Sequence, residues 1–127
     1  GKGAQSRSFI SAIPTEAFFD SLATRFDAAK GRDIKGVFQF ILPDSKEAVA
    51  IHVAGGVEMP RYGVTDASPT ATLTLNRSDL DDVIIGEASF PALIQSGKIR
   101  IEGDAQALLG WFMMHGAGNP MFNVVVP

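Results

Sequence analysis

The sequence predicts an α+β domain in which helices cover a sheet of about five, mainly antiparallel strands. Apolar residues recur at helical spacing near the start of the chain and again in its second half. Between these regions lie short segments of alternating polarity, separated by glycine and proline turns. Consecutive strands followed by helices are typical of α+β proteins, in which the helices gather on an antiparallel sheet.

The first predicted helix begins at Pro14, a residue that suits the first helical position, and Glu16 lies in its first turn. Gly31 is expected to end it. Its apolar residues recur at three-and-four spacing, which indicates a helix lying on a large apolar surface: Phe18, Phe19, Leu22 and Phe26.

Five segments have the composition and alternation of strands: 37–42, 48–54, 57–62, 71–75 and 98–102. Gly55 and Gly56 form a two-residue hairpin loop between the second and third. Pro60 cannot donate a ladder hydrogen bond, so the third segment is predicted to be an edge strand or to contain a bulge.

Three helices are predicted in the second half from their capping residues. Ser78, Ser89 and Asp104 are expected to be the N-caps, because their side chains can accept from the first free N–H groups. Gly86 and Gly97 are expected to end the first two of these helices.

Length and composition set limits on function. The chain has 127 residues, 46% hydrophobic and 20% charged, which fits one globular domain and argues against disorder. A net charge of −3 without a basic block argues against nucleic acid and anionic membrane surfaces. The chain has no cysteine, which excludes disulfides and thiolate chemistry, and no apolar run approaches the ~18 residues that span a bilayer.

We predict that residues 1–12 are an interdomain linker or an artificial extension, and that residues 13–127 form the domain. The segment from Gly1 to Arg7 is polar and lacks the hydrophobic stretch of a signal peptide. The compartment stays open at this point.

Few polar groups suggest catalysis, and no metal or cofactor is predicted. His52 and His115 have no ligand partner at metal-binding spacing, and the chain has no Gly-Xaa-Ser-Xaa-Gly motif. An independent enzyme would need an acid–base pair. The candidates for it are close together in sequence, although surface ion pairing explains them equally well: Glu58, Arg61, Tyr62 and Asp66.

Asp79, Asp81 and Asp82 crowd the start of one predicted helix. Favourable interaction with the helix dipole explains them, and a calcium site is the alternative. No glycine-turned loop with a distal glutamate accompanies them.

The last helix is apolar around most of its circumference, whereas a surface helix needs only one apolar stripe. Its apolar residues include two adjacent methionines, whose side chains adapt to variable partners: Leu108, Leu109, Trp111, Phe112, Met113 and Met114. This helix therefore buries a second face against the domain, a partner or a bound apolar ligand.

Several segments resemble sterol carrier protein type-two-like domains. These are the strand at 37–40, the segment 66–75 with the helix start at 77–80, and the strand at 96–104 framed by glycines. The end of the chain, 122–127, and the helix start at 13–16 resemble the C-terminal domain of bacterial alkyl sulfatases.

The resemblance implies a sheet and helices with an apolar tunnel between them, in an accessory domain that helps to hold aliphatic substrates. It places the chemistry in a separate zinc-dependent catalytic domain, so no catalytic residue is expected here. The compartment would be periplasmic or extracellular within such an enzyme, and cytoplasmic for a free-standing domain.

The expected ligand is a fatty chain, a sterol or an alkyl sulfate. The expected tunnel lining is Ile84, Leu93, Ile94, Ile101, Leu108, Trp111, Phe112, Met114 and Phe122. The alternative function is a docking or dimerisation module without a lipid ligand. In that case the last helix and the branched segment 124–126 would contact a catalytic domain or a second copy.

Overall fold

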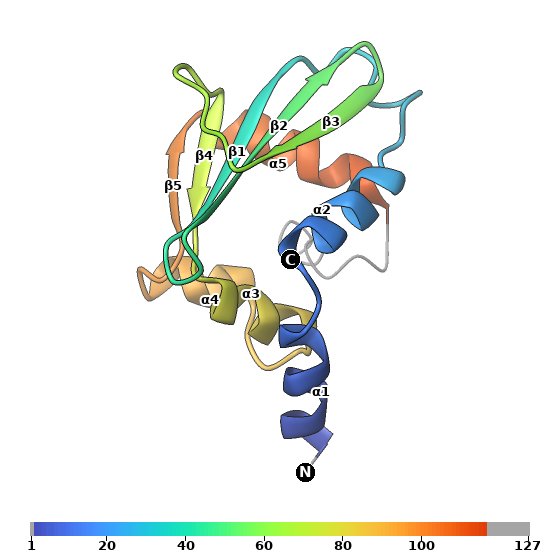
Figure 1. Ribbon diagram of the computed structural model, residues 1–127. Coiled ribbons are helices and arrows are strands. Elements are labelled where there is room, and N and C mark those ends of the chain that lie inside the picture. The colour runs from blue at the N-terminus through green and yellow to red at the C-terminus, as the bar shows by residue number, and fades with distance from the viewer. Residues whose placement is uncertain (1, 117–127) are drawn as a thin grey trace.

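The computed structural model describes residues 2–116 (Figure 1). A five-stranded sheet lies against helices that precede it, follow it and interrupt it. The elements in chain order are α1 (Lys2–Ser11), α2 (Thr15–Thr24), β1 (Gly36–Leu42), β2 (Glu47–Ala54), β3 (Val57–Tyr62), β4 (Ala71–Thr74), α3 (Arg77–Ile84), α4 (Phe90–Gln95), β5 (Arg100–Gly103), α5 (Ala105–Phe112) and the 3₁₀ turn η1 (Met113–His115).

The strand order is β3-β2-β1-β4-β5. The β1–β2, β2–β3 and β4–β5 ladders are antiparallel, and the central β1–β4 ladder is parallel. The predicted α+β class and the predicted five-stranded, mainly antiparallel sheet are confirmed.

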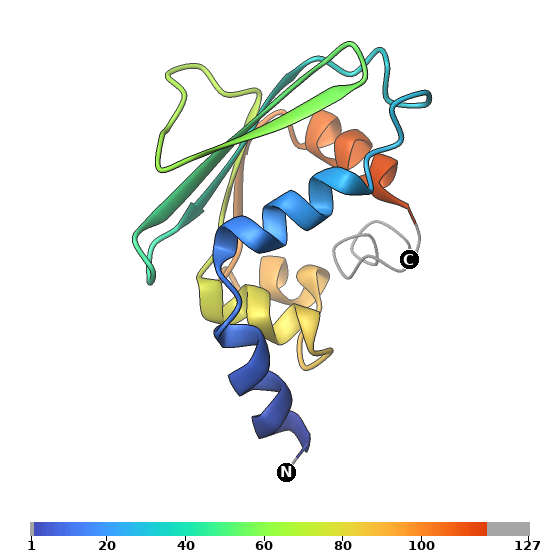
Figure 2. The ribbon, with the colours of Figure 1, turned by 45° about the vertical axis from the view of Figure 1, so that its right-hand side comes forward.

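Alternation along the strands separates a core face from an outer face. Phe38 and Phe40 of β1, with Leu73 of β4, lie on the core face and are fully buried. Trp111 of α5 stacks on Phe38 at a centroid distance of 5.0 Å and an interplanar angle of 12°. Figure 2 shows α2 and α5 on the same side of the sheet, with α3 and α4 beyond the ends of its strands.

Gly103 closes β5 in a conformation that a side chain would not tolerate. Its φ is +87°, and a Cβ atom there would lie 2.6 Å from the carbonyl oxygen of Thr70. The close approach lets the backbone N–H of Asp104 donate to that same carbonyl at 2.9 Å. This glycine therefore joins the end of β5 to the start of β4 and sets where α5 begins.

In the N-terminal segment, residues 2–11 form helix α1, which the sequence did not predict. It has no apolar stripe, and polar contacts with α3 hold it in place. The Arg7 guanidinium donates to Asp82 and, at 2.9 Å, to Glu87. These partners lie 75 and 80 residues further along the chain, so local sequence could not reveal them. The division of domains at residue 13 stays a prediction.

Two predicted caps are confirmed, since Ser89 and Asp104 accept from the N–H groups of Ala92 and Ala107. Helix α2 is shorter than predicted and ends at Thr24. No described helix is long and apolar enough to cross a membrane.

The predicted cap at Ser78 is wrong, because Asn76 occupies the N-cap position of α3. The carboxylate of Asp44, in the β1–β2 turn, accepts from the backbone N–H groups of Arg77 at 2.7 Å and Ser78 at 3.2 Å. Partial burial opposes charge on Asp44, but these hydrogen bonds outweigh it and lower the pKa of the carboxyl group. A residue from a distant turn therefore caps this helix.

Candidate functional site

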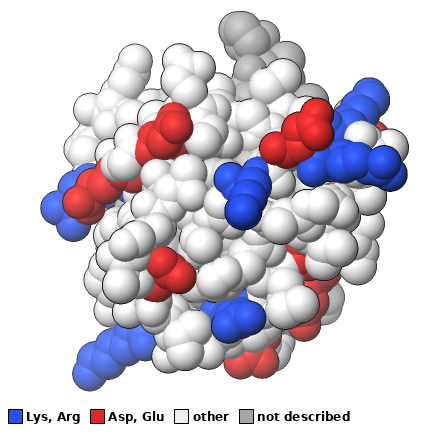
Figure 3. All heavy atoms as spheres, turned by 90° about the horizontal axis from the view of Figure 1, so that it is seen from above, with Lys and Arg blue, Asp and Glu red and all other residues white. Residues whose placement is uncertain are grey.

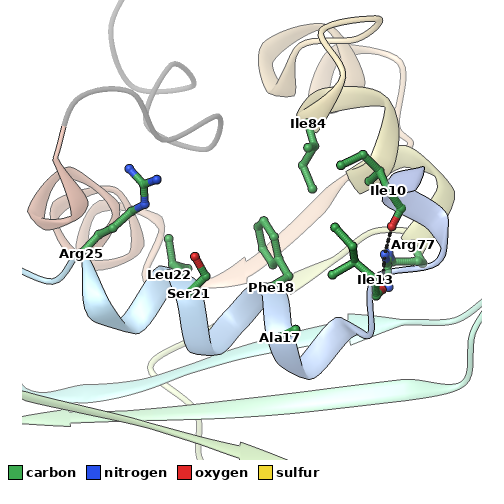
Figure 4. Close-up of a pocket in the computed structure, with 9 residues that line it drawn as sticks. All are labelled: Ile10, Ile13, Ala17, Phe18, Ser21, Leu22, Arg25, Arg77 and Ile84. Atoms are coloured by element: carbon green, nitrogen blue, oxygen red, sulfur yellow. Dashed lines mark hydrogen bonds between the residues drawn. The ribbon is translucent and has the colours of Figure 1, made fainter. Parts of the chain in front are cut away.

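An apolar groove of about 240 Å³ lies between α1, α2 and α3. Figure 4 shows Phe18 and Leu22 of α2 and Ile84 of α3 around this space. Its full lining is Ile10, Ile13, Ala17, Phe18, Ser21, Leu22, Arg25, Arg77 and Ile84.

Helix α2 can line the groove and also pack on the sheet because its two adjacent phenylalanines point in different directions. Phe19 is fully buried and packs against Phe40 of β1 at a centroid distance of 4.9 Å. Phe18 packs edge-on against Phe19 at 5.1 Å and faces the groove. Consecutive residues lie about 100° apart around a helix, so Phe18 and Phe19 face different surroundings.

Arg77 closes one end of the groove, and its guanidinium donates four hydrogen bonds. Its Nε donates to Asp81 at 2.8 Å, and Nη1 donates to the hydroxyl of Thr15 at 2.8 Å. Nη2 donates to the carbonyl oxygens of Ile10 and Ile13 at 2.8 and 2.7 Å. The Arg77 and Asp81 side chains are 14% and 5% exposed, and their ion pair lies within α3. The hydrogen bonds from Arg77 to Thr15, Ile10 and Ile13 therefore join the α1–α2 junction to α3.

The acidic cluster at the start of α3 is largely explained by arginines. Asp81 pairs with Arg77, and its second oxygen accepts from the hydroxyl of Ser11 at 3.3 Å. Asp82 pairs with Arg7 of α1. These two carboxylates therefore join helices, which explains them without a bound calcium ion.

Arg25 stands at the other end of the groove. It is the C-cap residue of α2 and is exposed. Figure 4 shows its guanidinium on the groove side of the helix, at the opposite end from Arg77. Within residues 7–116, no carboxylate forms an ion pair with it. Among the described side chains, this end of the groove therefore carries a positive charge without a carboxylate partner.

The structure distributes the predicted lining residues over several environments. Ile84 lines the groove. Four belong to the buried core, namely Leu93, Leu108, Trp111 and Phe112. Ile101 is half-buried against that core, Met114 is half-buried, and Ile94 is exposed on α4. Phe122 lies outside the described residues, and the lining role of the set stays a prediction.

The sequence-based lining omitted most of the groove. The predicted lining lacks Ile10, Ile13, Ala17 and Arg25. The pair Phe18–Phe19 could have indicated the groove from the sequence. Two adjacent phenylalanines point in different directions, so their helix needs an apolar environment on two sides.

Trp111 is fully buried, and its indole nitrogen has no hydrogen-bond partner among the described residues. Aromatic rings surround it, including Phe38 and Phe40 from β1 and Phe112 from its own helix. Leu108, Trp111 and Phe112 are thus buried within the domain, whereas Leu109 and Met113, on the other side of the helical segment, are 41% and 50% exposed.

The proposed acid–base group does not converge. In β3, Glu58 and Tyr62 lie on the core face, whereas Arg61 lies on the outer face. Glu58 is buried against His115, and Asp66 lies 3.9 Å from His52. The residues that are close in sequence are therefore separated by the sheet.

The outer face of the sheet carries a second, shallower groove of about 330 Å³. Val37, Val57 and Met59 contribute apolar surface, with Lys35 and Arg61 beside them. Figure 3 shows basic and acidic side chains interspersed on the face seen from above, with several basic side chains gathered at its right-hand edge.

The family model described as "Alkyl sulfatase C-terminal" matches residues 3–127. An (R)-specific secondary-alkylsulfatase from Pseudomonas sp. is 28% identical over 116 residues, which is 91% of this chain and 18% of that protein. A linear primary-alkylsulfatase from Pseudomonas sp. (strain ATCC 19151) is 33% identical over 79% of this chain and 19% of its own length. The chain therefore spans about a fifth of the length of these relatives.

Two solved structures have folds similar to that of this chain. A stereoselective inverting sec-alkylsulfatase from Pseudomonas sp. superposes with a TM-score of 0.75 at 25% identity, over 87% of this chain and 17% of that chain. Sterol carrier protein 2 like 2 from Aedes aegypti superposes with a TM-score of 0.53 at 20% identity, over 83% of this chain and 84% of that chain. The second likeness concerns the fold alone.

Proposed function

The chain belongs to the family of alkyl sulfatase C-terminal domains, and from this premise we propose that it is an accessory module that binds the aliphatic part of a long-chain amphiphile. The groove between α1, α2 and α3 is the proposed binding site. The observation that supports this proposal is the groove's apolar lining, with Phe18 and Leu22 on one wall and Ile84 on the other.

The size of the groove favours a single chain over a ring system. Its volume of about 240 Å³ lies below the roughly 300–1,000 Å³ of pockets that enclose drug-sized ligands. A slender alkyl chain fits such a space better than a sterol does. A fatty chain or an alkyl sulfate is therefore the preferred ligand.

The affinity of the groove should depend mainly on the length of the alkyl chain. A twelve-carbon chain gains about 10 kcal/mol gross, at ~0.8 kcal/mol for each buried CH₂ group. Association costs about 4–15 kcal/mol. Affinity is then modest and rises with each added carbon, until the chain reaches the end of the groove at Ile10 and Ile13.

We place the sulfatase chemistry outside this chain, in the remaining four-fifths of the full-length relatives. The buried Glu58–His115 pair and the arginine-bound aspartates of α3 leave the described domain without an evident acid–base site. The domain would act by holding the aliphatic part of a substrate, and the parent chain would supply catalysis.

The test is a methyl NMR titration of the chain labelled at isoleucine. Alkyl sulfates from octyl to tetradecyl are added below their micelle concentrations. We expect saturable shifts at Ile10, Ile13 and Ile84, with affinity rising about ten-fold per two carbons before it levels off. Ile51, buried at the sheet centre, is the internal control.

This titration also separates the groove from a tunnel beside α5. In a tunnel, the methyl groups of Ile94 and Ile101 would shift, as the predicted lining requires. The absence of any saturable shift in the folded, delipidated chain would contradict the binding function itself.

A second candidate function is docking, and the outer sheet face favours it. Val57 and Met59 are 57% and 51% exposed there, beside Lys35 and Arg61. Sedimentation of the chain with and without Met59→Glu tests association of copies through this face. A concentration-dependent mass that the substitution abolishes would support docking, and a monomer at all concentrations would contradict self-association.

A further inference from the structure

The two arginines of the groove are used in different ways. Arg77 donates to Asp81, Thr15 and two backbone carbonyls, so its charge is compensated and four of its five N–H donors are occupied. Arg25 has no ion-pair partner among residues 7–116. Among the described residues that line the groove, Arg25 is therefore the arginine that can offer its guanidinium to an anion.

We propose that Arg25 anchors the anionic head group of a single-chain amphiphile whose alkyl chain runs along α2 towards Ile10 and Ile13. This inference rests on the proposed function of the groove and adds the class of head group and its orientation. A guanidinium matches the geometry of a sulfate or a carboxylate, because two parallel N–H groups can donate to two oxygens.

The path of the chain follows from the helix. Ala17, Ser21 and Arg25 are spaced four residues apart and lie on one face of α2, beside Phe18 and Leu22. Arg25 is eight positions after Ala17, which corresponds to about 12 Å along the helix axis. The arginine stem packs along this wall while its charged end stays in water.

The opposite orientation is unfavourable. A head group at the Arg77 end would meet the carbonyl oxygens of Ile10 and Ile13 and the carboxylate of Asp81. These acceptors repel an anion, and desolvating a charge without a free donor is costly. At the Arg25 end the head group remains solvated, because that residue is exposed.

The test varies the charge of the ligand and the charge at residue 25 independently. Decyl sulfate, decanoate and uncharged decanol are titrated into the wild-type chain and into Arg25→Gln. We expect the substitution to weaken binding of both anions about five-fold, the scale of an exposed ion pair, and to leave decanol binding unchanged. The loss for the anions should shrink as salt is added.

Arg100→Gln is the matched control, because it removes the same charge from an exposed position on β5. It should leave binding of all three ligands unchanged. Equal affinity of wild type and Arg25→Gln for decyl sulfate, with decanol still bound, would overturn the anchor and keep the proposed function. Failure of the wild type to bind any of the three would overturn the proposed function itself.

Discussion

His115 and Glu58 form a buried pair in which Nε2 of the imidazole lies 2.9 Å from Oε1 of the carboxylate. The two side chains are 1% and 2% exposed. The other ring nitrogen, Nδ1, lies 3.2 Å from the carbonyl oxygen of Phe112. Through these two contacts the ring ties the end of α5 to the edge strand β3.

Removing one member of this pair should be strongly destabilising. We expect His115→Ala to lower the free energy of unfolding by about 3 kcal/mol, because Glu58 would remain buried without its partner. Urea denaturation measures the loss. His52→Ala is the control: His52 is partly exposed and 3.9 Å from Asp66, so it should cost less than about 1 kcal/mol. Equal losses in the two variants would contradict a stabilising role for the buried pair.

Arg77 should stabilise the α1–α2 junction as strongly as the His115–Glu58 pair stabilises the end of α5. Arg77→Met leaves Asp81 without its cation and frees the carbonyls of Ile10 and Ile13, so we expect a loss of about 3–5 kcal/mol. Amide hydrogen exchange should accelerate in α1 more than in β1. Arg100→Met, at an exposed site, should change stability by less than about 0.5 kcal/mol. Unchanged exchange in α1 would show that other contacts hold this helix.

Asp44 should stabilise α3 in a pH-dependent way. Asp44→Ala is expected to cost about 1 kcal/mol at neutral pH, the usual value of a lost cap. The pKa of Asp44 is lowered in the folded state, so its contribution is complete above the unfolded pKa near 4 and disappears as pH falls through the folded pKa. Urea midpoints of wild type and variant should therefore converge in acid. Ser78→Ala should cost much less, and a larger cost there would restore Ser78 as the cap.

The fold could be predicted because its signals are local. Strand alternation, the hairpin at Gly55–Gly56 and the caps at Ser89 and Asp104 each depend on neighbours within a few residues. The sequence-based predictions fail where contacts between residues far apart in the sequence determine the local structure. Helix α1 is held by partners on α3, and the N-terminus of α3 is capped from the β1–β2 turn.

The candidate site was harder to predict for the same reason. The apolar circumference of α5 indicated a ligand, but Trp111 and Phe112 fill the core against the sheet. The groove forms only where α1, α2 and α3 meet, and Ile10 comes from a helix without an apolar stripe. Ile84 is part of the predicted lining because the helical spacing of apolar residues in α3 is visible in the local sequence.

Trp111 can report which region a ligand enters. Because it is fully buried, we expect a blue-shifted emission maximum and weak acrylamide quenching. If a ligand occupies the groove, the maximum should stay unchanged while the Ile84 methyl group shifts to saturation. An emission change at the same ligand concentration would indicate entry beside α5, the site predicted from sequence. The protein unfolded in guanidinium gives the reference for an exposed indole.

Filling the groove should abolish binding without harming the fold. Ser21 is exposed on α2 and lines the groove, so Ser21→Phe adds a ring there and removes no core contact. We expect decyl sulfate affinity to fall more than ten-fold, with the free energy of unfolding within about 1 kcal/mol of wild type. Thr24→Phe, an exposed position of the same helix outside the lining, should bind normally. Normal binding by Ser21→Phe would move the site away from α2, because a ring and an alkyl chain cannot occupy one space of about 240 Å³ lined on both sides.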